Sequence, residues 1–220
     1  MELISGRLQI AHTAYYSLLK PATSTAAPLL IALHGYGQHA DKFVKVFEPL
    51  AARGIYVAAP QAPHHFYINL ARREVGFTWL TRYERDQGIR DFAAYMEQFY
   101  SMLIRDYPIE PEQIYVLGFS QGVSMAYRLW VHTSVPVQGL IACGADLPPD
   151  ITTKLIQARP IRILLVHGRQ DEVVPISKAH DAFAVLRHHD IQAEQFHFDG
   201  GHLVPPEALP LLAEMIRNNR

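Results

Sequence analysis

The serine at position 120 has the local sequence expected of a catalytic nucleophile. Residues 118–122 read Gly-Phe-Ser-Gln-Gly, between the apolar run Ile114–Leu117 and a helical pattern that extends to about His132. A serine in such a tight strand-to-helix turn projects its hydroxyl above the sheet, at a helix N-terminus whose dipole favours negative charge. Glycines are expected at 118 and 122 because side chains there would collide with neighbouring backbone. The alternative is a glycine-rich turn in which Ser120 only caps the helix.

A serine hydroxyl needs a base that a third group holds in place. Asp171 follows the buried run Ile161–Val166 and a glycine, and His202 follows a pair of glycines after Phe198. Both positions lie where strands end, and the chain order serine, acid, histidine is that of nucleophile-elbow hydrolases. The sequence therefore predicts Ser120 as nucleophile, His202 as general base and Asp171 as the acid that orients it.

Each of these partners has a structural alternative. Asp171 could cap a helix near Pro175, and His202 is one of 12 histidines. Glu172 and Asp199 are rival acids, but Glu172 lies one residue along the loop and should point elsewhere, and Asp199 has the character of a turn former. The order, spacing and placement of the three residues together favour the triad.

Ester cleavage also needs hydrogen-bond donors for the oxyanion that develops on the substrate. The residue after the nucleophile, Gln121, can supply its backbone N–H. Residues 34–38 read His-Gly-Tyr-Gly-Gln after the apolar run Leu29–Leu33. We expect a second donor from this loop and favour the Tyr36 N–H over that of Gly37. The alternative is a glycine turn that leads into a helix near Asp41.

Short β-rich runs alternate with helical patterns, as in parallel sheets built from strand–helix–strand units. The first two runs alternate polar and apolar residues and suit an antiparallel edge, whereas the middle runs are continuously apolar, as in strands buried on both faces. The strand candidates are Glu2–Ile10, Ala14–Leu19, Leu29–Leu33, Tyr56–Ala59, Ile114–Leu117, Gly139–Ala142, Ile161–Val166 and Ala193–Phe198. Apolar residues at helical spacing predict helices over Gln87–Arg105 and around Ala179–Leu186. The last helix either begins near Pro210 or kinks there.

Composition excludes several other classes of protein. The chain has 220 residues, a formal net charge of −1 and 49% hydrophobic residues, which suits one globular domain over residues 1–220 and argues against a nucleic-acid partner. Its single cysteine, Cys143, ends an apolar strand and is read as a core residue, and no histidine spacing indicates a metal site. No signal peptide or membrane-spanning run is seen, so we expect a cytoplasmic protein without stable membrane insertion. A homodimer is compatible with this sequence.

Four segments together resemble the phospholipase/carboxylesterase family of α/β-hydrolases, to which acyl-protein thioesterases also belong. They are Leu33-His34-Gly35-Tyr36-Gly37, Gly118-Phe119-Ser120-Gln121-Gly122, His167-Gly168-Arg169-Gln170-Asp171 and Gly201-His202. The resemblance covers nearly the whole chain in the right order. It implies an α/β-hydrolase fold with a mostly parallel central sheet, helices on both faces and no large cap domain. It also implies a serine hydrolase that uses Ser120, Asp171 and His202 as its triad, Tyr36 and Gln121 as oxyanion donors, and no cofactor or metal.

The resemblance extends to a substrate pocket for an acyl group. Leu147-Pro148 is similar to the family's Leu-Pro after its sixth strand, and the aromatic pair of the family corresponds here to the segment with Phe77 and Trp79. We expect Phe77, Trp79, Leu147, Val174 and Leu203 to line the pocket. The expected substrates are small to medium acyl esters. Acyl-thioesters and lysophospholipids are alternatives, as are an acyltransferase and a non-catalytic ligand-binding protein on the same scaffold.

Overall fold

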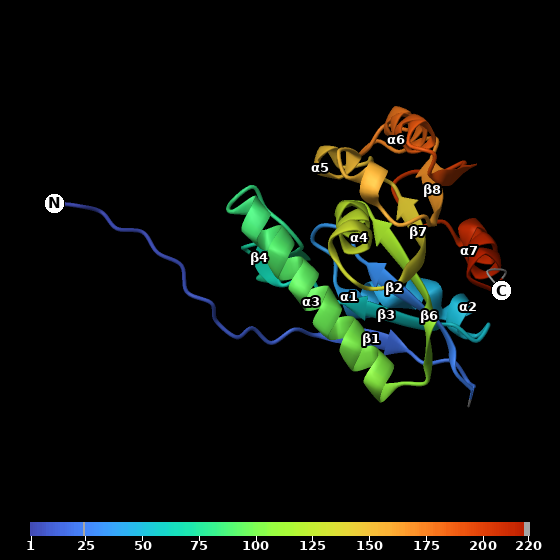
Figure 1. Cartoon of the computed structure of the whole chain (residues 1–220), viewed down its shortest axis with the longest axis horizontal. Coiled ribbons are helices and arrows are strands. Elements are labelled where there is room, and N and C mark those ends of the chain that lie inside the picture. Colours follow the sequence, from blue (N-terminus) through green and yellow to red (C-terminus); the bar gives the residue numbers. More distant parts are fainter. Residues whose placement is uncertain (24, 218–220) are drawn as a thin grey trace.

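A seven-stranded sheet forms the centre of the fold (Figure 1). The structure is a computed structural model and describes residues 1–23 and 25–217. The strands run in the order β1-β3-β2-β6-β7-β8-β9. They are β1 (Tyr16–Leu19), β2 (Ala27–Leu33), β3 (Tyr56–Pro60), β6 (Ile109–Phe119), β7 (Val137–Cys143), β8 (Arg162–Gly168) and β9 (Gln192–Phe198). Only the edge strand β1 is antiparallel to its neighbour within this sheet; the other paired strands are parallel.

Helices cover both faces of the sheet (Figure 1). One face packs against α3 (Arg85–Asp106), α4 (Gln121–His132), α5 (Pro149–Thr152), η2 (Leu155–Gln157) and α6 (Ser177–His188). The other face packs against α1 (Ala40–Phe43), η1 (Val44–Phe47), α2 (Glu48–Ala51), η3 (Pro206–Ala208) and α7 (Leu209–Arg217), where η denotes a 3-10 helix. Among the described residues, none of the helices combines the length and the apolar composition that crossing a bilayer requires.

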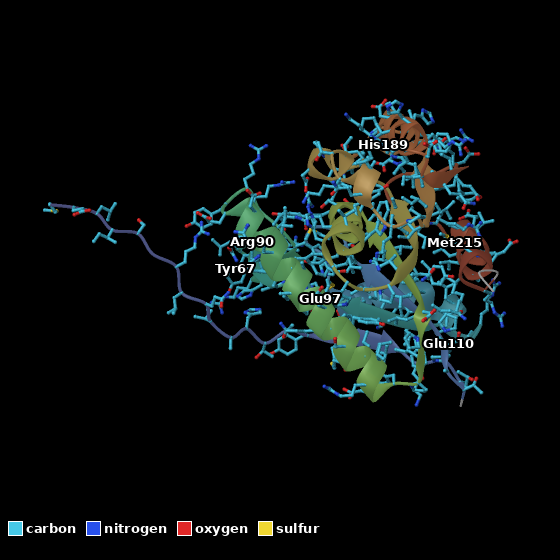
Figure 2. All side chains as sticks on the ribbon, in the orientation of Figure 1. Tyr67, Arg90, Glu97, Glu110, His189 and Met215 are labelled. Carbon is cyan, nitrogen blue, oxygen red and sulfur yellow. The ribbon has the colours of Figure 1, made fainter. Side chains whose placement is uncertain are left out.

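Strand β2 shows how the two faces are built. Leu29, Ile31 and Leu33 belong to the core beneath α3 and α4, whereas Leu30 and Ala32 belong to the core beneath α1 and α7. Successive side chains of a strand point to opposite faces, so a continuously apolar strand serves two cores at once. Figure 2 shows side chains filling the space between the sheet and the helices on both of its sides.

Most elements match those that the sequence predicts. The six apolar strands are confirmed, as are the helices around Gln87–Arg105 and Ala179–Leu186, within a few residues at their ends. Helix α7 begins at Leu209, next to Pro210, so the first of the two alternatives for the last helix holds. The predicted strand Ala14–Leu19 is present but begins at Tyr16.

The prediction of a strand over Glu2–Ile10 is wrong. This segment forms no strand, and its large apolar side chains such as Leu3 and Leu8 are exposed. Figure 1 shows it extending away from the sheet. Alternation of polar and apolar residues favours a strand only where a neighbouring strand can bond its backbone and cover its apolar face.

A two-stranded antiparallel sheet, which the sequence did not predict, stands beside the central one. It consists of β4 (His64–Asn69) and β5 (Glu74–Thr78). The Gly37 N–H donates to the Phe77 carbonyl at 2.8 Å, and His39 Nε2 donates to the Val75 carbonyl at 2.7 Å. This hairpin therefore packs on the loop after β2 that the sequence singled out for an oxyanion donor.

The register of the parallel strands brings their carboxyl ends to one edge. Leu33 of β2 pairs with Gly118, Phe119 of β6 pairs with Cys143, and Gly168 of β8 pairs with Phe198. Ligands of open α/β sheets bind outside the carboxyl ends of the strands. The loops that leave these ends carry the residues predicted to do chemistry.

Candidate active site

Ser120 occupies a strained turn between β6 and α4. Its φ is 52° and its ψ is −120°, a backbone conformation that non-glycine residues rarely adopt. The Ser120 N–H donates to the Cys143 carbonyl at 2.9 Å, which ties the turn to the neighbouring strand. Its side chain makes no capping hydrogen bond to α4, so the alternative of a capping serine is not what the structure shows. Strain of this kind gathers at functional sites.

The glycines on either side of the serine are required by sterics, as the sequence predicts. A Cβ added at Gly118 would lie 2.4 Å from the Gly122 carbonyl oxygen. A Cβ added at Gly122 would lie 2.1 Å from the Leu33 carbonyl oxygen. Helix α4 therefore starts in direct contact with the end of β2, and the serine is brought close to the loop that follows β2.

Asp171 and His202 form a hydrogen-bonded pair. His202 Nδ1 lies 2.7 Å from Asp171 Oδ2, and a carboxylate oxygen accepts, so Nδ1 carries a proton; in the neutral ring, Nε2 is then the nitrogen with the lone pair. Asp171 Oδ1 accepts from the Val173 and Val174 N–H groups, each at 2.9 Å. Burial opposes the ionisation of Asp171, but the bonds from Val174, His202 and Val173 outweigh it and lower its pKa. The site thus holds a carboxylate against an imidazole.

The rival acids point away from this pair. Glu172 is exposed, and the side chain of Asp199 is 84% exposed and pairs with Arg169 at 3.3 Å. Asp171, by contrast, has a side chain that is only 1% exposed. Among the three carboxylates, Asp171 is the one that contacts His202.

The ring of His202 lies beside the turn that holds Ser120. It packs on the ring of Phe119, the residue before the serine, with 4.8 Å between centroids. A Cβ added at Gly144 would lie 3.2 Å from its Nδ1 and Cε1, and Gly144 directly follows the Cys143 whose carbonyl bonds the Ser120 N–H. Within the described residues, no group forms a hydrogen bond with Ser120 Oγ. The hydroxyl and the imidazole therefore share neighbours without a bond between them, as is common in enzymes without substrate.

The loop after β2 brings a backbone amide close to Ser120. A Cβ added at Gly35 would lie 3.3 Å from Ser120 Cβ, so this loop passes close to Ser120. The Gly37 N–H is taken by the Phe77 carbonyl. Within the described residues, nothing accepts a hydrogen bond from the Tyr36 N–H. Of the two amides weighed from the sequence, the one at Tyr36 is therefore the one left for a ligand.

Gln121 begins helix α4, where the first N–H groups have no acceptor within the helix. Its side chain is engaged elsewhere. Oε1 accepts from the Trp79 N–H at 3.0 Å, and Nε2 donates to the Leu80 carbonyl at 3.0 Å. The carboxamide thus holds the end of the β4–β5 hairpin, while the backbone N–H of Gln121 has no acceptor among the described residues.

The residues expected in the pocket fall into two groups. Phe77, Val174 and Leu203 are partly or fully accessible, and Leu147 is 8% exposed. Trp79 differs, because it is 1% exposed and packs between His34 and Phe92 in the core. Its indole leaves almost no surface for a substrate, and its N–H donates to the His34 carbonyl at 2.8 Å. We therefore assign Trp79 to the support of the site rather than to its lining.

Sequence reasoning did not single out two buried histidines near the site. His167 Nε2 donates to the Val174 carbonyl at 2.8 Å and lies 3.5 Å from Asp171 Oδ2. His34 is fully buried at the end of β2. Both belong to motifs that the sequence displays, but only their tertiary neighbours show which groups they hold. Cys143 is buried beneath the site, and its burial raises the pKa of its thiol, which suits a core residue.

Comparisons with known proteins identify the family and the fold of the chain. A model of the phospholipase/carboxylesterase family matches residues 16–219. None of the curated proteins compared with the chain matches it. Among solved structures, the chain resembles the esterase PE8 with a TM-score of 0.77 and 24% identity, over 93% of this chain and 98% of that one.

Two further structures show the same fold at lower identity. The acyl-protein thioesterase 2 of Zea mays has a TM-score of 0.67 and 17% identity, over 93% of this chain and 98% of that one. The carboxylesterase of Bacillus cereus has a TM-score of 0.69 and 14% identity, over 93% and 94%. The fold is that of the α/β-hydrolases, and the chain belongs to the phospholipase/carboxylesterase family.

Proposed function

We propose that this protein is a serine carboxylesterase that hydrolyses small to medium acyl esters through an acyl-enzyme. The observation that carries the proposal is the Asp171–His202 hydrogen bond of 2.7 Å beside the strained turn of Ser120. Because Nδ1 of His202 donates to Asp171, its Nε2 is the nitrogen that can accept a proton. Membership of a family of ester hydrolases supports the same chemistry.

In the first half of the reaction, His202 Nε2 takes the proton from Ser120 Oγ as the oxygen attacks the acyl carbonyl carbon. The carbonyl oxygen becomes an oxyanion, and the N–H groups of Tyr36 and Gln121 donate to it. The imidazolium then gives its proton to the departing alkoxide oxygen, and the acyl group remains on Ser120. Asp171 stabilises the imidazolium throughout without taking its proton.

In the second half, water replaces the alcohol. His202 accepts a proton from the water as its oxygen attacks the acyl-enzyme, and the same two amides hold the new oxyanion. When the tetrahedral intermediate breaks down, the proton returns to Ser120 Oγ and the carboxylic acid leaves. The residues of this chain supply every proton transfer in the cycle.

The surface around the site suits an apolar acyl group. Tyr36 lies in the proposed oxyanion loop and is 60% exposed. Leu203 follows the proposed base, His202, and is 45% exposed. We propose that they form an apolar surface for the acyl group together with Phe77, Leu147 and Val174, which are partly exposed or, for Leu147, 8% exposed. We assign the acyl chain of the substrate to this surface.

The test is labelling by a fluorophosphonate probe together with hydrolysis of p-nitrophenyl esters. The wild-type protein should be labelled at Ser120, and Ser120→Ala should lose the label and at least about three orders of magnitude in kcat. Ser124→Ala is the matched control, because Ser124 lies one helical turn later and donates to the Gln121 carbonyl at 2.9 Å. It should keep both label and activity. If the wild-type protein is not labelled and cleaves no ester, the proposal is wrong, and a non-catalytic ligand-binding protein is favoured instead.

The substrate is tested separately with acetate, butyrate and octanoate offered as oxygen esters and as thioesters, and with a lysophospholipid. We expect the highest kcat/KM for the oxygen esters. Faster cleavage of the thioesters or the lysophospholipid would replace the substrate assignment and leave the mechanism intact. Product analysis with an alcohol present distinguishes hydrolysis from acyl transfer.

A further inference from the structure

His34 is a buried imidazole at the oxyanion loop that the proposed mechanism does not use. It is fully buried at the point where β2 ends, one residue before Gly35. We propose that His34 is a positioning residue, whose single N–H orients the peptide that presents the Tyr36 amide to the oxyanion. This inference rests on the proposed function, because it assigns a role within the same reaction.

The hydrogen-bond partners of His34 determine which of its nitrogens carries the proton. Its Nε2 lies 3.1 Å from the backbone nitrogen of Ala62 and 2.7 Å from Nε2 of Gln61. A backbone N–H can only donate, so Nε2 of His34 accepts. Gln61 is oriented independently, because its Oε1 accepts from the Ala40 N–H at 2.9 Å and its amino group is left to face the imidazole.

The imidazole is neutral at physiological pH. Burial lowers its pKa to about 4, a bond to the Gly35 carbonyl opposes this, and the charge of His39 adds to it. A neutral imidazole with an accepting Nε2 carries its proton on Nδ1. The Nδ1–H therefore donates to the Gly35 carbonyl oxygen, at 2.8 Å.

This bond controls the direction of the Tyr36 N–H. The Gly35 carbonyl and the Tyr36 N–H belong to one peptide unit, which is trans, so they point in opposite directions. The carbonyl is held by His34 and also by the Gln38 N–H at 3.2 Å. Because the oxygen of this peptide is held towards His34 and Gln38, the Tyr36 N–H points away from these two residues. Gly35 itself lies against Ser120, so the amide is close to the nucleophile.

A second set of bonds joins His34 to the other proposed donor. The Trp79 indole N–H donates to the His34 carbonyl at 2.8 Å, and the Trp79 backbone N–H donates to Gln121 Oε1 at 3.0 Å. The two residues that supply oxyanion amides, Tyr36 and Gln121, are therefore held by one buried tryptophan and one buried histidine. Preorganised donors of this kind stabilise a transition state because they need no rearrangement during the reaction.

Two substitutions separate positioning from simple packing. In His34→Asn, the side-chain amino group occupies the place of Nδ1 and keeps the bond to the Gly35 carbonyl, but it leaves the Ala62 N–H without an acceptor. In His34→Gln, the side-chain oxygen reaches the place of Nε2 and keeps the bond to Ala62, but the side chain no longer donates to the Gly35 carbonyl, which is left with only the longer bond from the Gln38 N–H at 3.2 Å. The larger cavity of the asparagine variant makes it the less stable of the two.

We expect kcat to depend on whether the side chain at position 34 donates to the Gly35 carbonyl. It should not depend on the thermal stability of the variant. His34→Gln should lose about 10- to 100-fold in kcat, with KM changed less than about threefold, because the loss is confined to transition-state binding. His34→Asn should keep kcat within about tenfold of wild type despite its lower melting temperature. Affinity for a trifluoromethyl ketone, which forms an oxyanion on Ser120, should fall in His34→Gln by the same factor as kcat.

Two outcomes overturn the inference and leave the proposed function standing. One is a wild-type protein that is labelled and active while His34→Gln matches it in kcat. The other is a loss of kcat that follows melting temperature, with His34→Asn the worse variant. A wild-type protein that reacts with neither ester nor fluorophosphonate overturns the proposed function itself.

A measurement on the wild-type protein tests the inference even if both variants fail to fold. Nitrogen-15 NMR of the histidine rings distinguishes a protonated Nδ1 from a protonated Nε2. His34 should show the Nδ1–H form at neutral pH. An Nε2–H form would mean that no proton is available for the Gly35 carbonyl, and the inference would be wrong.

Discussion

His202 Nδ1 lies 2.7 Å from Asp171 Oδ2, although the two residues come from different loops. Asp171 follows β8 and His202 follows β9, which are neighbouring parallel strands paired up to Gly168 and Phe198 at their carboxyl ends. The register of these two strands therefore sets the contact. A Cβ at Gly168 would lie 2.3 Å from the Gly200 carbonyl oxygen, so the two loops touch directly where they leave the sheet.

Replacing the acid of this pair should impair catalysis without unfolding the protein. In Asp171→Asn the amide cannot stabilise a charged imidazole and no longer selects the tautomer with a free Nε2. We expect kcat to fall by about three to four orders of magnitude. Steady-state hydrolysis of a p-nitrophenyl ester measures this. Asp199→Asn is the control, because Asp199 is exposed and pairs only with Arg169; an equal loss in both variants would argue against the assignment of Asp171.

Gly122→Ala should destabilise the fold. The new Cβ would lie 2.1 Å from the Leu33 carbonyl oxygen and 2.8 Å from that of His34, and both are backbone atoms that cannot turn aside. We expect a loss of at least about 3 kcal/mol in the free energy of unfolding, measured by urea denaturation. Gly6→Ala should leave it unchanged, because no atom lies within 4 Å of the added Cβ. A fully stable Gly122→Ala protein would mean that α4 is not packed on β2 in this way.

The stability of the protein should fall in mild acid, partly through His34. Its pKa is lowered from 6.5 to about 4 by burial, so the unfolded chain binds a proton in this interval and the folded chain does not. The unfolding free energy therefore falls as the pH drops from 6.5 towards 4, by about 3 kcal/mol for this one group, and levels off below 4. Above pH 6.5 the contribution is constant.

The measurement compares wild type with His34→Gln at pH 7 and at pH 4 by urea denaturation. The lowered pKa values of His64, His132 and His197 act in the same direction but are common to both proteins. Wild type should lose about 3 kcal/mol more than the variant between the two pH values. The same loss in both proteins would show that His34 is not held neutral.

The ion pair between Arg128 of α4 and Asp150 of α5 should be needed for stability. Arg128 has a side chain only 1% exposed and contacts Asp150 Oδ1 at 2.8 Å, while Arg85 contacts the same oxygen at 3.0 Å. Burial opposes ionisation of Asp150, but hydrogen bonds from both arginines outweigh it and lower its pKa to about 2. These bonds tie α5, which follows Leu147, to α3 and α4.

Asp150→Asn leaves the buried Arg128 without a counter-charge, and we expect it to reduce the unfolding free energy by about 3 kcal/mol. Asp106→Asn is the matched control. Asp106 pairs with Arg105 at 2.7 Å on the surface, and exposed pairs of this kind contribute little. Thermal and urea denaturation measure both variants. Equal stability of Asp150→Asn and wild type would show that water reaches Arg128 freely.

The order of the elements and the identity of the candidate site could be predicted because they depend on local patterns. Apolar runs mark strands buried on both faces, and the ends of parallel strands meet at one edge of the sheet. Ser120, Asp171 and His202 could therefore be singled out by their places after such runs, before any contact between them was known. The sterics of a sharp turn likewise required Gly118 and Gly122.

The remaining features depend on partners that are distant along the chain. Alternation over Glu2–Ile10 favours a strand, but no strand forms there, since β structure needs backbone partners that the segment itself does not contain. Trp79 is a large aromatic residue of the kind expected to line an acyl pocket. Its place in the core follows from bonds to His34 and Gln121, some 40 positions away. Local sequence determines which residues end a strand or permit a turn, whereas burial and hydrogen bonding join groups from across the chain and exist only once it has folded.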